Sequence, residues 1–213
     1  FFEDSPNDDI PADYKGVPIV LVALSTPVFL SFEPETFTRF SEDARKQVRE
    51  TQEVIMGGIS GANVNLNGEF GTIGYFCRKK SVFGTRPGVY LLSNSHVFAD
   101  LRKPAPDTED LIVQPSPGEA AVSRRPIAEL TDFAHPRLEN DTNDANFVDA
   151  AIAKLWRQEM HKPLMPLIGK VNGYVEKSDV EVGEKCRKFG RTTGLTRGAV
   201  FSVYLDLKVS YDR

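Results

Sequence analysis

The sequence predicts an all-β fold that follows an N-terminal extension. From residue 57 onward, β-branched and aromatic residues come in short runs, and glycine, proline and asparagine separate these runs. Short runs of this kind with turn residues between them are typical of β-barrels and sandwiches. We expect strands near residues 59–65, 70–77, 88–94, 110–115, 126–131 and 148–154, enough for one Greek-key barrel.

The first 55 residues are predicted to be an extension outside this barrel. Residues 1–13 hold five acidic residues and two prolines, a composition that favours a solvated arm. Residues 17–32 are rich in β-branched and aromatic residues but contain two prolines, which indicates edge strands. In residues 34–51 apolar side chains recur at helical spacing among charges, so we expect an amphipathic helix with Phe37, Phe40, Ala44 and Val48 on one face.

The last part of the chain is predicted to begin a second barrel. After a crossing connection over residues 156–165, strands are expected at 185–190 and 198–209, preceded by Val171, Val175, Val180 and Val182. The chain therefore divides into an extension (1–55), a first barrel (56–160) and a partial second barrel (161–213).

Composition and charge exclude two classes of partner. With 213 residues, 40% hydrophobic and 26% charged, the chain resembles an ordinary globular protein that buries a core. The net charge of −4 shows no basic excess, so a nucleic-acid partner is not expected. The longest apolar run, residues 17–24, is too short to span a bilayer, so no membrane is expected either.

A histidine and an aspartate stand where two predicted strands meet loops. His96 directly follows the strand at 88–94, and an imidazole placed there is a candidate general base. Asp149 heads a strand of small apolar residues, where a buried carboxylate could orient that imidazole. Two simpler alternatives stay open, a structural histidine and an aspartate that caps a turn. Asp141 and Asp144 compete for the role of the acid, but they lie in a polar loop.

Four segments resemble the chymotrypsin-like serine proteases, particularly the bacterial trypsin-like branch. They are the small-residue strand 71–76 (GTIGYF), the strand end 93–97 (SNSHV), the acid with its small-residue strand 149–153 (DAAIA), and 188–200 (KFGRTTGLTRGAV), which is similar to the segment that opens the second barrel. The resemblance covers residues 56–213. It implies a chymotrypsin-like double β-barrel and cleavage of protein or peptide substrates without a cofactor, with His96 as general base and Asp149 orienting it.

The family's nucleophile motif, Gly-Asp-Ser-Gly-Gly, does not occur in the sequence. We expect the serine to come from beyond residue 213, in a complementary C-terminal segment of the same protein. Two alternatives remain: a protease-fold binding or regulatory module without a nucleophile, and a protease of an intracellular defence or signalling system controlled by an activator protein.

Cysteine use bears on the compartment. Val97 stands where secreted members of the family place a disulfide cysteine beside the histidine, and Cys77 and Cys186 are the only two cysteines. We expect both to be buried, reduced thiols, which fits a reducing compartment. The first residues show no signal peptide, so a cytoplasmic location is expected.

Other motifs favour structural interpretations. Ser60 lies in a sequence similar to the Gly-x-Ser-x-Gly elbow of α/β-hydrolases, but Ala62 replaces the last glycine, so a tight strand entry is expected. The glycines of residues 190–198 indicate a hairpin turn rather than a phosphate loop. No metal is expected, because His135 and His161 lack partners at zinc spacing and the acids of residues 139–146 lack EF-hand spacing.

Overall fold

The computed structural model describes residues 13–14, 17–18, 38–79, 88–120, 123–135 and 148–204. Strands β1 (Asp13–Tyr14) and β2 (Val17–Pro18) form a two-residue antiparallel ladder. The predicted acidic arm, the edge strands up to residue 32 and the acids of residues 139–146 lie almost entirely outside the described residues, as does the segment 205–213.

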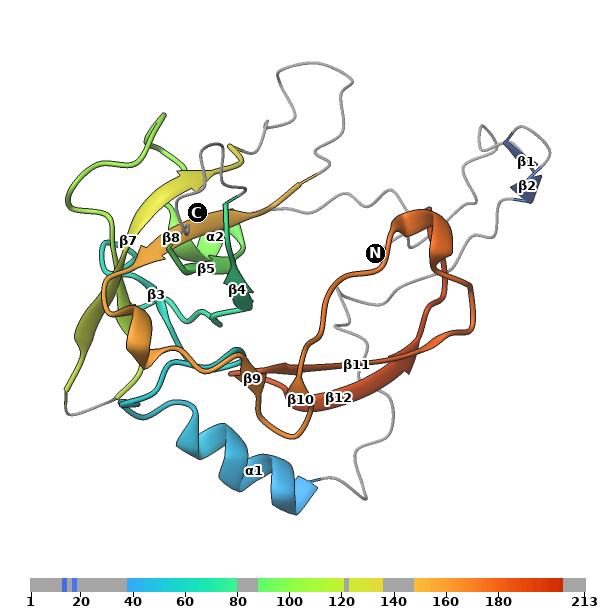
Figure 1. Ribbon diagram of the computed structural model, residues 1–213, viewed down its shortest axis with the longest axis horizontal. Helices are drawn as coiled ribbons and strands as arrows, with labels where there is room; N and C mark the ends of the chain where they lie inside the picture. Colours follow the sequence, from blue (N-terminus) through green and yellow to red (C-terminus); the bar gives the residue numbers. More distant parts are fainter. Residues whose placement is uncertain are drawn as a thin grey trace, which may run out of the picture.

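A six-stranded antiparallel sheet forms the main part of the molecule (Figure 1). Its strands follow the spatial order β3-β6-β7-β8-β5-β4. The bounds are β3 (Ala62–Asn63), β4 (Tyr75–Cys77), β5 (Tyr90–Ser93), β6 (Leu111–Gln114), β7 (Arg125–Phe133) and β8 (Ala151–Leu155). Each strand falls in or overlaps one of the six predicted segments, and the predominance of strands confirms the all-β class.

The chain approaches itself just before the two outer strands, β3 and β4. Ser60 and Thr72 form an isolated antiparallel bridge, and the Gly61 N–H donates to the Gly71 carbonyl at 3.1 Å. A side chain at residue 71 would collide with Val97 and with the Gly61 carbonyl, so only glycine permits this approach. These contacts connect the two outer edges, but the described residues form no closed barrel, because the edge pairing is limited to short segments.

The core lies on one side of this sheet and collects the inward residues of all its longer strands. On β8, for example, Ala151, Ala153 and Leu155 are buried while Lys154 is exposed. This alternation follows from the period of two along a strand. The largest fully buried apolar side chains are Ile55, Ile59, Ile73, Leu91, Phe98, Ile112 and Leu155.

Helix α1 (Thr38–Gln47) confirms the centre of the helix predicted at 34–51. It continues as a turn, in which the Val48 N–H donates to the Ala44 carbonyl at 3.1 Å. Val48 is buried in the core, and its carbonyl accepts from the Ser60 N–H at 2.9 Å, which ties the helix end to the sheet. Arg45 and Lys46 occupy the last turn, where a positive charge interacts favourably with the helix dipole.

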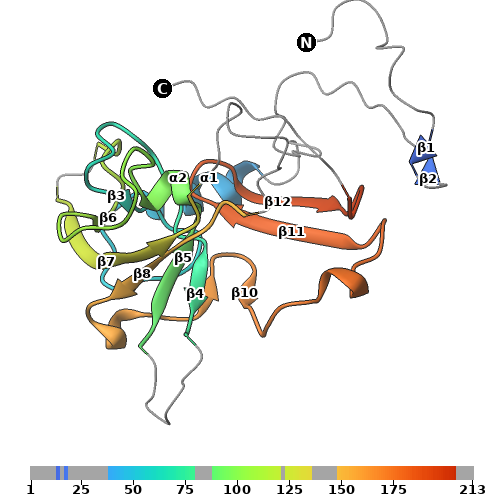
Figure 2. The same ribbon diagram turned by 90° about the horizontal axis from the view of Figure 1, so that it is seen from above.

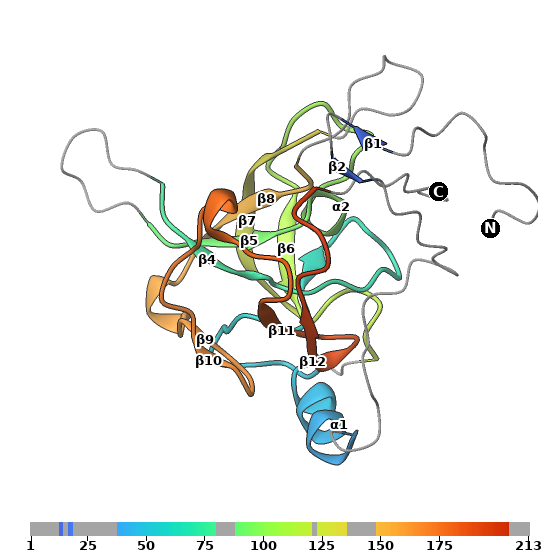
Figure 3. The ribbon, with the colours of Figure 1, turned by 90° about the vertical axis from the view of Figure 1, so that its right-hand side faces the viewer.

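The remaining elements lie beside the six-stranded sheet (Figure 2). Strands β9 (Leu164–Met165) and β10 (Gly169–Lys170) pair with each other, and β11 (Lys185–Gly190) pairs with β12 (Gly194–Ala199). Single-turn helices occupy Gln158–Met160 and Lys177–Asp179. Helix α1 lies under β12 in the views of Figures 1 and 3, and the two elements are in contact.

The hairpin formed by β11 and β12 differs from the prediction in the position of its second strand. The strand at 185–190 is found where expected, but its partner covers 194–199 rather than 198–209. The chain reverses earlier because residues 191–193 form the turn and Gly194 takes a left-handed conformation, with φ of 63°. The valines before the hairpin do not form a strand core either, since Val175 and Val182 are 63% and 65% exposed.

Candidate active site

His96 sits on a one-turn helix, α2 (Ser95–Phe98), directly after β5. The turn forms because the N–H groups of Val97 and Phe98 both donate to the Asn94 carbonyl at 3.1 Å. Ser95, Val97 and Phe98 are buried and anchor the turn in the core. The His96 side chain, by contrast, is 40% exposed, so it is fixed at its backbone and accessible at its ring.

The structure brings His96 and Asp149 together. The His96 Nδ1 lies 2.6 Å from the Asp149 Oδ2, and the other carboxylate oxygen accepts from the Ser95 N–H at 2.7 Å. Asp149 therefore caps the first turn of α2 and contacts the imidazole at the same time. One side chain thus makes both a capping contact and a contact with the imidazole, and it is 31% exposed rather than fully buried.

Strand pairing sets this arrangement. β5 and β8 are antiparallel neighbours in which Ser93 lies opposite Ala151. His96 follows the end of β5 by three residues, and Asp149 precedes the start of β8 by two. Both side chains consequently emerge at the same end of the same strand pair, which is why an acid far along the chain reaches the imidazole.

The charge state of the pair follows from its surroundings. Burial alone would raise the pKa of Asp149, but the charge of His96, its hydrogen bond and the backbone N–H groups of Ser95 and His96 outweigh burial and hold that pKa below its usual range. Asp149 is thus ionised at neutral pH and can only accept. The proton on His96 Nδ1 must point at Asp149, so in the neutral imidazole Nε2 is the nitrogen that carries the lone pair.

Three consecutive side chains before His96 hold its strand end, and the sequence did not reveal their role. Ser93 Oγ donates to the Thr72 carbonyl at 2.7 Å. Ser95 Oγ lies 2.7 Å from the Ala134 carbonyl and 3.0 Å from the Ala150 carbonyl. Asn94 Nδ2 contacts the Asp149 carbonyl at 3.0 Å and its Oδ2 at 3.2 Å. The only signal was the polar run SNS at the end of an otherwise apolar strand.

The other residues considered from the sequence do not join this pair. Ser60 is fully buried and contacts the Ser116 hydroxyl at 2.8 Å, so it is inaccessible to a substrate. His161 Nδ1 contacts the Gln158 carbonyl at 2.5 Å, and His135 lies against the Phe133 ring. Asp141 and Asp144 lie outside the described residues. Across the described segments, no three His, Cys, Asp or Glu side chains are grouped to hold a metal.

A buried polar network joins the hairpin to the sheet. Arg191 Nε donates to Glu119 Oε1, and the two side chains are 9% and 8% exposed. Ser60 Oγ also donates to Glu119 Oε1, at 2.9 Å, and Arg191 lies 4.0 Å above the Phe70 ring. Burial by itself would raise the pKa of Glu119, but the hydrogen bonds from Arg191 and Ser60 and the charges of Arg191 and Arg49 hold it below its usual range.

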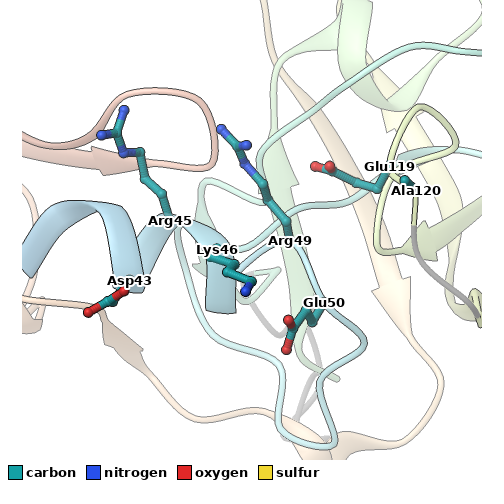
Figure 4. Close-up of a pocket in the computed structure, with 7 residues that line it drawn as sticks. All are labelled: Asp43, Arg45, Lys46, Arg49, Glu50, Glu119 and Ala120. Carbon is teal, nitrogen blue, oxygen red and sulfur yellow. The ribbon is translucent and has the colours of Figure 1, made fainter.

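A cavity of about 630 Å³ opens beside this network, at the end of α1 (Figure 4). Arg45 and Arg49 point to one side of it, and Lys46 and Glu50 point to the other (Figure 4). Its lining holds three basic and three acidic side chains together with Ala120, namely Arg45, Lys46, Arg49, Asp43, Glu50 and Glu119. The formal charges of the lining therefore sum to zero.

Both cysteines are free thiols. Cys77 is half-buried, and burial raises its pKa despite the opposing charge of Lys79. Cys186 is exposed, so the expectation of two buried thiols is wrong for this residue. The reason is that residues 185–188 of β11 all face solvent, since only Phe189 on that strand is buried.

Comparison of the sequence with models of known protein families gives no match, and comparison with curated proteins gives none either. Within the described part of the chain, no helix has the length and apolar character needed to cross a membrane. The chemical interpretation of the site therefore rests on its geometry.

Proposed function

We propose that the chain belongs to a chymotrypsin-like serine endopeptidase, in which His96 is the general base and Asp149 orients it. The observation that carries the proposal is the 2.6 Å contact between His96 Nδ1 and Asp149 Oδ2 at the common end of two paired strands. The lowered pKa of Asp149 supports it, because an ionised carboxylate fixes the tautomer that a general base needs.

In this mechanism His96 Nε2 accepts the proton of a serine hydroxyl as the serine oxygen attacks a peptide carbonyl. The imidazolium that forms is stabilised by Asp149, which stays ionised. The same proton then passes from Nε2 to the leaving amine, and water repeats the sequence on the acyl-enzyme. The exposed ring of His96 supports access of a protein or peptide substrate. We assign the serine to none of the described residues.

The barrel architecture is part of the proposal. The backbone hydrogen bonds between residues 58–61 and 71–73 connect the two outer edges of the six-stranded sheet. The Ile73 N–H donates to the Ile59 carbonyl at 2.9 Å, and the Gly58 N–H donates to the Ile73 carbonyl at 2.7 Å. Contacts of this kind are expected of a sheet that curls toward closure.

The test uses a fluorophosphonate probe on the complete protein, with peptide mapping of the labelled residue, and a peptide-cleavage assay in parallel. His96→Ala should abolish labelling, and it should lower cleavage by about three to four orders of magnitude, because triad members act as a unit. Asp149→Asn should be similarly severe. The matched control is His161→Ala, which removes an imidazole that contacts the Gln158 carbonyl and not Asp149. It should leave labelling and cleavage unchanged.

Two results would contradict the proposal. One is cleavage by His96→Ala at the wild-type rate with an unchanged circular dichroism spectrum. The other is a complete protein that cleaves no peptide and takes up no probe, which would favour a protease-fold binding module. If cleavage requires a second protein added to the assay, the protease is of the activator-controlled kind.

A further inference from the structure

Asn94 occupies the N-cap of helix α2 but does not cap it. Asparagine is among the best N-cap residues, because its side chain normally accepts from an N–H of the first turn. Here the Asn94 side chain makes no such bond. The N–H of Ser95 is taken instead by Asp149 Oδ1, at 2.7 Å. The amide of Asn94 is therefore free for a different contact.

That contact is with Asp149 itself. Asn94 Nδ2 lies 3.0 Å from the Asp149 carbonyl oxygen and 3.2 Å from its Oδ2. Both partners are acceptors only, so the amide end that faces them must be the NH₂ group. Oδ2 is also the oxygen that contacts His96 Nδ1. Asn94 thus fixes both the backbone and the carboxylate of the residue that orients the imidazole.

We infer that Asn94 is a positioning residue for the His96–Asp149 pair, acting through Asp149 and not on a substrate. This inference rests on the proposed function of that pair. Its amide restricts rotation of the carboxylate about its own side-chain bonds, so that Oδ2 stays in line with Nδ1. Without Asn94, Oδ1 is still held by Ser95, but Oδ2 loses one of its two side-chain donors.

The chain offers a matched control at Asn65. Its Nδ2 also donates to a backbone carbonyl, that of Glu109 at 3.1 Å, and to a carboxylate oxygen, Asp110 Oδ1 at 3.4 Å. Asn65 and Asn94 are both exposed residues. Asn65→Ala consequently removes the same kind of hydrogen bonds as Asn94→Ala. The aspartate affected is Asp110, which contacts Lys103 and not His96.

The experiment reads the tautomer of His96 by nitrogen NMR of histidine-labelled protein, which is practicable because the chain has three histidines. In the neutral imidazole, the wild type and Asn65→Ala should carry the His96 proton on Nδ1 alone. Asn94→Ala should show a second population protonated at Nε2. Asn94→Asp keeps the shape but replaces the donor by a like charge, so it should show a larger second population.

Peptide cleavage gives the second readout. Asn94→Ala should lower kcat about tenfold, the effect of losing one hydrogen bond to a charged group, with KM within twofold. An unchanged His96 tautomer in both Asn94 variants would overturn the inference, as would an equal change in Asn65→Ala. If the wild type cleaves no peptide and takes up no probe, the proposed function fails, while the tautomer of His96 still decides the role of Asn94.

Discussion

The region from residue 55 to residue 160 and the region from 161 to 204 differ in how they are held together. The first contains the six-stranded sheet and nearly all buried apolar residues, from Ile55 to Leu155. The second contributes a single buried apolar side chain, Phe189, and exposes four consecutive residues of β11. The first region therefore has a core of its own, and the second depends on contacts with the first.

Those contacts begin with backbone hydrogen bonds, from the Gly57 N–H to the Leu164 carbonyl at 3.0 Å and from the Lys162 N–H to the Ile55 carbonyl at 2.9 Å. Phe189 packs against Gly58, whose left-handed backbone (φ of 84°) leaves no room for a side chain. Two residues later, Arg191 in the β11–β12 turn meets Glu119 in the loop between β6 and β7. The comparison teaches that the second region is held to the first by backbone hydrogen bonds, by the Phe189 ring and by a buried ion pair, and not by a core of its own. The His96–Asp149 pair, in contrast, lies wholly within the first region.

The largest effect is expected from Arg191→Met. It leaves Glu119 buried without its counter-charge, which should cost about 3–5 kcal/mol in the free energy of unfolding measured with urea. The loss should shrink as the pH falls, because burial raises the pKa of an unpaired Glu119 and protonation removes the charge. Arg187→Met, on an exposed position of the preceding strand β11, is the control and should change stability by less than about 0.5 kcal/mol. Equal effects of the two variants would refute the role of the ion pair.

The next largest effect is expected from truncating an aliphatic side chain, and its size should differ between the two regions. Leu91→Ala removes a fully buried side chain from β5 and should destabilise the protein by about 2–5 kcal/mol. Val182→Ala, in the second region, should stay within about 0.5 kcal/mol. Thermal and urea unfolding measure both. A loss of similar size at Val182 would mean that the second region has a core that its exposure does not show.

A smaller effect is expected at the candidate site. The pKa of Asp149 is lowered in the folded protein, so its ionisation stabilises the fold at neutral pH, and this contribution is lost as the pH falls through the usual aspartate range. The difference in unfolding free energy between wild type and Asp149→Asn should therefore be larger at pH 7 than at pH 3. The control is Asp132→Asn, at an exposed position of β7. A difference independent of pH would mean that the pair does not form.

The smallest effect concerns the two thiols. Cys186 is exposed, whereas Cys77 is half-buried with a raised pKa, so Cys186 should react with a maleimide faster, by about tenfold or more. Single variants Cys77→Ser and Cys186→Ser assign the two phases of the reaction. Faster labelling of Cys77 would show that the first region opens more readily than the second, opposite to the comparison made above.

The sequence predicted well what depends on local pattern. The six strands follow from alternation and turn residues, and His96 and Asp149 were found because each stands at the end of a strand. The start of β12 was missed because a glycine can continue a strand or begin one, and only the turn at 191–193 decides this. The Glu119–Arg191 pair could not be predicted, because its members are 72 residues apart and meet only when the two regions dock. The roles of Asn94 and Ser95 depend equally on partners more than 35 residues away.

The pairing of Ser93 with Ala151 has a consequence for how such a site can vary. One step of slippage between β5 and β8 would move Asp149 by about 3.3 Å relative to His96, far enough to break a 2.6 Å contact. It would also turn the buried residues of β8 outward, so the core itself opposes the slip. The distance between the two side chains is thus insensitive to their separation along the sequence, which is 53 positions here. Insertions and deletions in the loops between β5 and β8 can therefore alter the surroundings of His96 while the distance between Asp149 and His96 stays constant.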